Sequence, residues 1–119
     1  MVEFAIAGGL FSVILLGMFE FGAAAWSKNN VAADAREGAR YAIVHGTRSG
    51  SATDSAGVAS YVKGRSSLGS AIRVYAWWPS GTKVQDDPVV VSVAYTVPRR
   101  GPFIPAHNDS ATSKMRIVF

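Results

Sequence analysis

The chain of 119 residues contains no cysteine, which excludes a disulfide framework and any metal site built on thiolates. Basic residues give a net charge of +4, but they are scattered along the chain rather than gathered in a run. A scattered excess is typical of a solvated basic surface, so we expect no nucleic-acid partner. The length allows one small domain, or a helix with a small domain attached.

Side chains suited to catalysis are also scarce. The two histidines, His45 and His107, have no second ligand at metal spacing. The sequence shows no nucleophile signature and no glycine-rich phosphate loop after a strand. We therefore expect no enzyme, no cofactor and no metal ion.

Charge is scarcest in residues 1–26, where the apolar excess lies. The segment lacks the basic start of an intact secretory signal. From Phe4 to Trp26, helical rise gives about 35 Å, enough to span a hydrocarbon core of roughly 30 Å. Glu3 and Glu20 interrupt the segment. They either bracket the hydrocarbon at its two edges or meet an opposite charge in an apolar assembly, because burying an unpaired carboxylate costs several kcal/mol.

The helical pattern continues beyond Trp26. No proline occurs between Ser27 and His45, and small or apolar residues recur there at helical spacing along one stripe. The stripe consists of Val31, Ala35, Gly38 and Ala42. Glu37 can pair with Arg40 on another face. We predict one helix of about 45 residues, ending near His45 with Gly46 as its cap, apolar on all sides over 1–26 and amphipathic over 27–47.

Residues 48–119 predict a small globular head. Thr53 or Asp54 is placed to cap a short helix that ends at about Ser66. Three later runs, near 71–78, 89–97 and 113–119, alternate with period two and predict an antiparallel sheet with one wet face. The predicted dry face holds Ile72, Val74, Ala76 and Trp78, then Val89, Val91, Val93, Tyr95 and Val97, then Met115, Ile117 and Phe119.

The fold class is therefore α+β, with the amphipathic half of the long helix covering the dry face of the sheet. Trp77 and Trp78 point to opposite faces of one strand, so one belongs to the core and the other is an exposed interface or ligand anchor. Residues 98–110 are rich in proline and predict an ordered surface loop. Within this loop, Asn108, Asp109 and Ser110 match the N-glycosylation acceptor pattern at Asn108. The same three residue types are also common in turns, so the match has two interpretations.

The stretch "VEFAIAGGLFSVILLGMFEFG", followed by "AAAWSKNNVAADAREGARYAIV", resembles the TadE-like pilins, relatives of type IV pilins in tight-adherence (Tad) systems. The resemblance covers about residues 1–45. It rests on Val2–Phe4, the apolar run, Glu20–Gly22 and Ala35–Ala42 taken together.

The resemblance implies a pilin-like precursor that a prepilin peptidase cleaves and that waits in the inner membrane. A pilus assembly platform then adds it to an extracellular filament made of copies of itself, whose core is a bundle of N-terminal helices. The family's glutamate falls at Glu3. It lies nearer the start of the chain than in mature type IV pilins, and no leader precedes it, so the processing site stays open.

In such a filament Glu3 would accept the N-terminal ammonium of Met1, from its own or a neighbouring subunit, and so fix axial register. Glu20 either stays near the membrane edge or pairs with Lys28 or another cation between subunits. The residues expected to pack in the filament core are Phe4, Ile6, Leu10, Phe11, Val13, Ile14, Leu15 and Leu16.

Three functions therefore compete. The first is a structural pilin used for adherence or surface contact. The second keeps the fold but makes the chain a minor, tip or priming pilin. The third is a single-pass membrane-anchored module whose head binds a ligand through the long loop and the tryptophan pair.

Overall fold

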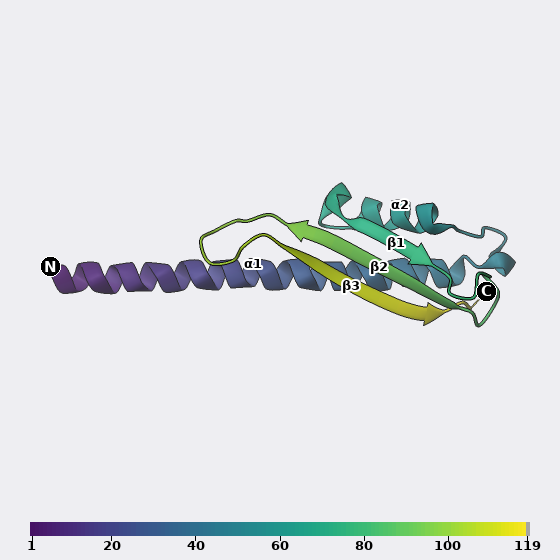
Figure 1. The fold of residues 1–119 in the computed structure, drawn as a ribbon, viewed down its shortest axis with the longest axis horizontal. Helices are drawn as coiled ribbons and strands as arrows, with labels where there is room; N and C mark the ends of the chain where they lie inside the picture. The colour runs from purple at the N-terminus through teal and green to yellow at the C-terminus, as the bar shows by residue number, and fades with distance from the viewer. Residues whose placement is uncertain (119) are drawn as a thin grey trace.

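The computed structural model describes residues 1–118, which form one long helix and a small mixed head. The helix α1 covers Val2–Val44 and α2 covers Ser55–Arg65, with short 3-10 helices at Thr47–Ser49 and Gly69–Ala71. The strands are β1 (Arg73–Trp77), β2 (Pro88–Val97) and β3 (His107–Arg116). Figure 1 shows the N-terminal half of α1 projecting from the head, and the molecule measures 74 × 22 × 19 Å. This architecture confirms the predicted α+β fold class.

The single long helix is also confirmed, and it runs unbroken through Gly8 and Gly9. Its cap is His45, whose backbone N–H donates to Ala42 O at 3.3 Å. The prediction of Gly46 as the cap was wrong by one residue. Gly46 instead begins the first 3-10 turn in an extended conformation, because the chain turns directly into Thr47–Ser49.

The three strands form an antiparallel sheet in the order β1-β2-β3. Val91 in the central strand pairs with Ala76 on one side and Ser113 on the other. The dry face packs on the predicted stripe of α1. The short helix α2 adds Val58 and Val62 to the same core and contacts both β1 and α1. The buried core includes Val31, Ala35, Ala39, Ala42, Val58, Val62, Ile72, Val89, Val91 and Val93. Phe119 lies outside the described residues.

Local signals placed α2 and β1 correctly. Asp54 caps α2, and its Oδ1 accepts a hydrogen bond from Gly57 N at 2.7 Å. Of the tryptophan pair, Trp77 is exposed, whereas Trp78 is half-buried under Lys83, whose Nζ lies 4.5 Å from the ring centroid. The expectation that one tryptophan is exposed and the other packed is confirmed.

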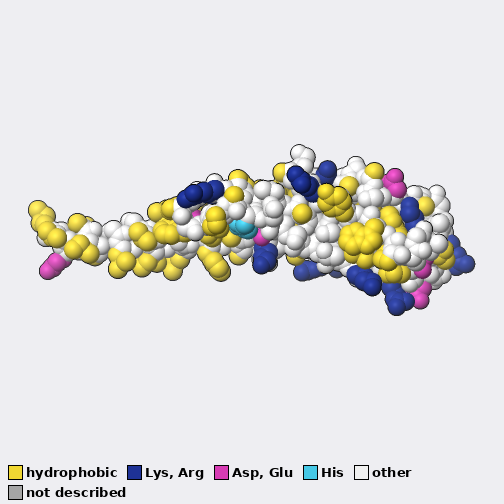
Figure 2. Space-filling model, in the orientation of Figure 1, with side chains coloured by type: hydrophobic (Ala, Val, Ile, Leu, Met, Phe, Trp, Pro, Cys, Tyr) yellow, Lys and Arg dark blue, Asp and Glu magenta, His cyan; other side chains and the backbone are white. Residues whose placement is uncertain are grey.

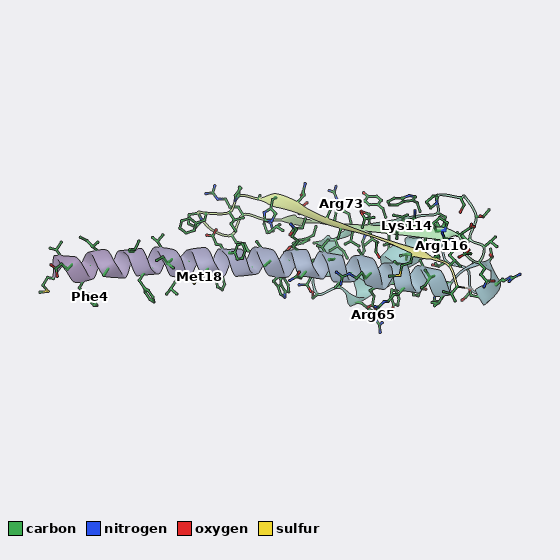
Figure 3. The ribbon with its side chains drawn as sticks, turned by 90° about the horizontal axis from the view of Figure 1, so that it is seen from below. Phe4, Met18, Arg65, Arg73, Lys114 and Arg116 are labelled. Carbon is green, nitrogen blue, oxygen red and sulfur yellow. The ribbon has the colours of Figure 1, made fainter. Side chains whose placement is uncertain are left out.

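Three local expectations were wrong. β3 begins at His107, so the loop is residues 98–106 and Asn108 lies in a strand, because β3 pairs with all ten residues of β2. Val90 is buried although it lies on the predicted wet face, since it is flanked there by Trp77 and Lys114. Glu37 pairs with Arg65 at 3.1 Å, not with Arg40, because α2 brings that cation across. Figure 3 shows Arg65 on the opposite side of α1 from Arg73 and Lys114.

The head approaches α1 most closely at Gly38. A Cβ there would lie 2.9 Å from Val62 Cγ2 and 3.0 Å from Val91 Cγ1, tighter than ordinary van der Waals contact. Both neighbours are fully buried β-branched side chains with little room to move. The absence of a side chain at Gly38 therefore allows α1, α2 and the sheet to pack closely at this point.

Gly38→Ala and Gly64→Ala are expected to shift head stability in opposite directions. At Gly38 the added methyl overpacks the core, which typically costs about 1–3 kcal/mol and exceeds the helix-propensity gain of about 1 kcal/mol. Gly64 lies in α2 with no atom within 4 Å of an added Cβ, so only the propensity gain remains. Thermal unfolding of the two full-length variants in detergent checks this. An equal rise in Tm for both would contradict the close packing at Gly38.

Candidate assembly helix and its junction with the head

The first part of α1, residues 2–19, carries mainly apolar side chains around the helix and is not buried against the rest of the described chain. The eight residues predicted to pack in a filament core have exposed fractions between 47% and 84%. Phe4 and Met18 project into open space from this half in Figure 3. The helix is long and apolar enough to cross a membrane. Because so much apolar surface is unfavourable in water, this half needs lipid or other protein around it.

Met1 and Glu3 lie at the exposed tip of this helix. The tip is held by a backbone hydrogen bond from Ala5 N to Met1 O at 3.3 Å. Within residues 1–118 no ion pair involves Glu3. Both Met1 and the Glu3 carboxylate are therefore accessible to a second copy of the chain.

Glu20 marks the place where the exposed helix half meets the head. Its side chain is almost buried, with 9% exposed. Its Oε2 accepts hydrogen bonds from two successive backbone N–H groups of the 98–106 loop, Phe103 N at 3.1 Å and Ile104 N at 2.8 Å. Hydrogen bonds to a charged acceptor are among the stronger ones in proteins. Glu20 thus ties the loop to the helix.

The loop approaches the Glu20 side chain most closely at Gly101. A Cβ on Gly101 would overlap the Glu20 carboxylate. A side chain at this position would displace the Glu20 carboxylate from its present place and so disturb its hydrogen bonds to the loop. Figure 1 shows the loop between β2 and β3 lying against α1 at this level.

A second polar contact lies about two turns further along the helix. Ser27 Oγ donates to Asp109 Oδ2 at 2.9 Å, and both groups are buried. His107 Nε2 lies 3.6 Å from the other oxygen of the same carboxylate. The start of β3 is therefore fixed to α1 close to the Glu20 junction.

The space between loop and helix is a small cavity of about 60 Å³. It is lined mainly by apolar side chains, including Phe19, Ala23, Val97 and Ile104. That volume suits a water molecule or two rather than a substrate. In the described part of the chain, no cluster of histidine and acidic side chains is arranged to hold a metal ion.

Comparison with known proteins bears on the helix alone. The family model described as TadE-like protein matches residues 1–40, which include the exposed half of α1 and part of its packed half. The match covers the N-terminal third of the chain, which is therefore similar to TadE-like proteins over that part. This match indicates a Tad pilus-related protein with an apolar N-terminal helix. No curated protein and no solved structure matches the chain.

The TadE-like segment contains Glu3 and Glu20, and the structure treats them differently. Glu3 is exposed at the tip, as an intermolecular role requires. Glu20 accepts hydrogen bonds from two backbone N–H groups of its own chain. The sequence did not predict this contact, since it indicated either a position at the membrane edge or a pair with Lys28 or another cation. Gly101 inside the proline-rich loop was the available signal for this close approach. Asn108 lies on the exposed face of β3, so it is accessible but is not in a turn.

Replacing Glu20 with alanine is expected to release the 98–106 loop. The Phe103 and Ile104 N–H groups would lose their acceptor, and a polar group left unsatisfied typically costs about 1–3 kcal/mol. Arg99 and Arg100 lie in the loop and are trypsin sites, so cleavage there should accelerate about tenfold or more. Glu20→Gln keeps an oxygen acceptor and should be intermediate.

Limited trypsin digestion of the full chain in detergent, followed by mass spectrometry, measures this effect. Glu3→Ala is the matched control, since it removes the other carboxylate of α1 but none of the loop contacts. Cleavage at Arg99 and Arg100 that is equally slow in wild type and Glu20→Ala would show that Glu20 does not hold the loop.

Proposed function

We propose that this chain is a structural subunit of a Tad-type pilus and that it assembles through the N-terminal half of α1. The observation that carries the proposal is the projecting helix half, which is mainly apolar and, apart from the half-buried Gly17, exposed from Val2 to Phe19. The TadE-like match over residues 1–40 supports the same context. A head of this size needs no such helix for its own stability, because its core uses only the stripe from Val31 onward.

Two environments would satisfy the exposed half in turn. In the inner membrane, lipid surrounds the helix before assembly. In the extracellular filament, neighbouring helices replace the lipid. Lipid tails are as apolar as the side chains, so assembly depends on close packing and on polar contacts rather than on the hydrophobic effect.

Small residues on the helix favour such close packing. Ala5 and Gly9 are four residues apart, as are Gly8 and Ser12, and no side chain lies over Gly8, Gly9 or Gly17. Small residues at this spacing allow helix backbones to approach one another in an apolar medium. The Ser12 hydroxyl donates to Gly8 O at 2.8 Å, so it leaves no unpaired donor in the bundle.

The Glu3 carboxylate would then meet a Met1 ammonium of a neighbouring subunit. A buried pair of this kind adds little net stability, but misplacement leaves two unpaired charges. The pair therefore selects the axial position of each incoming subunit. A prepilin peptidase and a pilus assembly platform are the partners that this function requires before assembly.

Electron microscopy of sheared surface filaments, with mass spectrometry of their main band, tests the proposal. This chain should be the main component if it is the structural pilin. Recovery at a low ratio to another pilin would assign it to the minor, tip or priming class. Its absence from filaments, together with retention in the inner membrane, would overturn the assembly proposal.

The membrane-anchored binding module keeps one specific observation in its favour. Tyr75 and Trp77 are exposed on the open face of the sheet, alongside the basic side chains of Arg73 and Lys114. The pairing Arg73–Ala94–Ser110 and Trp77–Val90–Lys114 places all four on one face. Such a face offers stacking and positive charge to a ligand, and it would be available on a monomer or on a filament.

A further inference from the structure

The 98–106 loop lies at a defined height along α1. From Val2 to Glu20, helical rise gives about 27 Å, close to the roughly 30 Å hydrocarbon core of a bilayer. When the exposed half of α1 spans a membrane, Glu20 and the loop hydrogen-bonded to it therefore lie at the level of the lipid headgroups. The loop is the part of the head nearest to the membrane in the arrangement of Figure 1.

The exposed charge at this end of the head is basic. Arg99 and Arg100 are both exposed. The two nearby carboxylates, Glu20 and Asp109, are withdrawn from the surface, with 9% and 7% exposed, and both accept hydrogen bonds. Figure 2 shows Lys or Arg side chains above α1 at this end of the head, next to hydrophobic ones. A surface of this sign attracts anionic headgroups.

The tip of the same loop is apolar. Pro102 is exposed, Phe103 is 50% exposed and Ile104 is half-buried. Phe19 and Phe21 are exposed on α1 at the same level. Apolar and aromatic side chains beside arginines are typical of segments that lie in the membrane interface. The two hydrogen bonds to Glu20 already hold the tip in place, so little ordering is required on binding.

We propose that the 98–106 loop is a membrane-surface contact that binds anionic phospholipid headgroups. Arg99 and Arg100 meet the phosphates, and Phe103 enters the interfacial layer beside Phe19. The contact continues the surface of the apolar helix, and it fixes the height and tilt of the head before assembly. The inference rests on the membrane-anchored stage of the proposed function and is independent of filament formation.

Lipid contact can be measured with the full-length chain, because the absence of native cysteine allows one labelling site. A fluorophore is attached at Pro102→Cys in the loop, or at Ser80→Cys in the β1–β2 connection as a distant control. The variants are reconstituted in phosphatidylcholine vesicles with or without phosphatidylglycerol, each containing a lipid with a nitroxide on its headgroup. Resistance to carbonate extraction confirms insertion, and filament formation is scored separately in cells.

We expect clearly stronger quenching of the Pro102→Cys label in the anionic vesicles than in the neutral ones, and little quenching of the Ser80→Cys label in either. Arg100→Glu should weaken the loop–lipid equilibrium by at least about fivefold, and Arg99→Glu/Arg100→Glu by more. Because Arg99 Nε donates to Gly101 O at 3.1 Å, the Arg100→Glu single variant is the cleaner test. Arg48→Glu, the same charge reversal in the exposed turn Thr47–Ser49 beyond the other end of α1, should change nothing.

Equal quenching of the Pro102→Cys label in both vesicle types would overturn the proposal, as would no effect of Arg100→Glu. A chain that carbonate extracts from the vesicles would overturn both this inference and the anchored stage. Loss of filaments in cells with normal quenching would overturn only the pilin assignment, so the two failures are distinguishable.

Discussion

Val91→Asp is expected to unfold the head. Val91 lies at the centre of the sheet, is fully buried, and touches the position of Gly38 on α1. An aspartate there would place an unpaired carboxylate among valines and alanines, which costs several kcal/mol. The loss should exceed about 4 kcal/mol, a large share of the stability of a small domain. Thermal unfolding followed by near-UV circular dichroism measures it.

Thr112→Asp supplies the matched control for this change. Thr112 lies on the neighbouring strand β3, but on the open face, where it is exposed. A carboxylate there stays hydrated, so the effect on stability should lie within about 1 kcal/mol. Comparable unfolding of both variants would show that the burial of Val91 does not decide head stability. If Val91→Asp were as stable as wild type, Val91 would have to lie on the open face of the sheet and not on the face that packs on α1.

Local patterns were enough to predict the main elements and their faces. The stripe of Val31, Ala35 and Ala42 follows the helical period, and Val89, Val91 and Val93 follow the period of a strand. Both patterns arise because one face of each element must leave water. Packing the apolar stripe of the helix against the apolar face of the sheet was then enough to predict that the sheet lies on the helix.

Contacts between distant parts of the chain were not predictable in this way. Glu20 meets the loop 83 and 84 positions later, and the partner of Glu37 is the cation of Arg65, 28 positions away. Each contact depends on the path of a loop or connecting segment, and the conformation of such a segment produces no periodic pattern in the sequence. The start of β3 was missed for a related reason. Its first residues are polar on both faces, and Asp109 is buried where it accepts a hydrogen bond from Ser27 of α1.

The two carboxylates of the apolar segment lie in different surroundings. Glu20 is satisfied within its own chain and defines where the apolar half ends. Glu3 lies at the opposite end, exposed, and within residues 1–118 it makes no ion pair. Only Glu3 therefore requires a partner from outside the chain when the helix enters an apolar assembly.

Glu3→Ala is accordingly expected to reduce assembly severely while leaving membrane insertion unchanged or improved. Without Glu3, the Met1 ammonium of each subunit would enter a low-dielectric bundle unpaired. Removing one partner of a buried ion pair typically costs about 3–5 kcal/mol, and the cost recurs at every subunit added. Glu3→Gln keeps the shape and part of the hydrogen bonding, so its effect should be intermediate.

Filament yield per membrane-inserted subunit measures this prediction for wild type, Glu3→Ala and Glu3→Gln. Glu20→Ala is the control, because it removes a carboxylate that pairs within its own chain. Its filament yield should fall far less than that of Glu3→Ala, even though its loop becomes susceptible to trypsin. Equal yields for wild type and both Glu3 variants would place Glu3 in hydrated surroundings at the bilayer edge. In that case the register of the filament would depend on the packing of Phe4, Ile6 and the small residues that follow them.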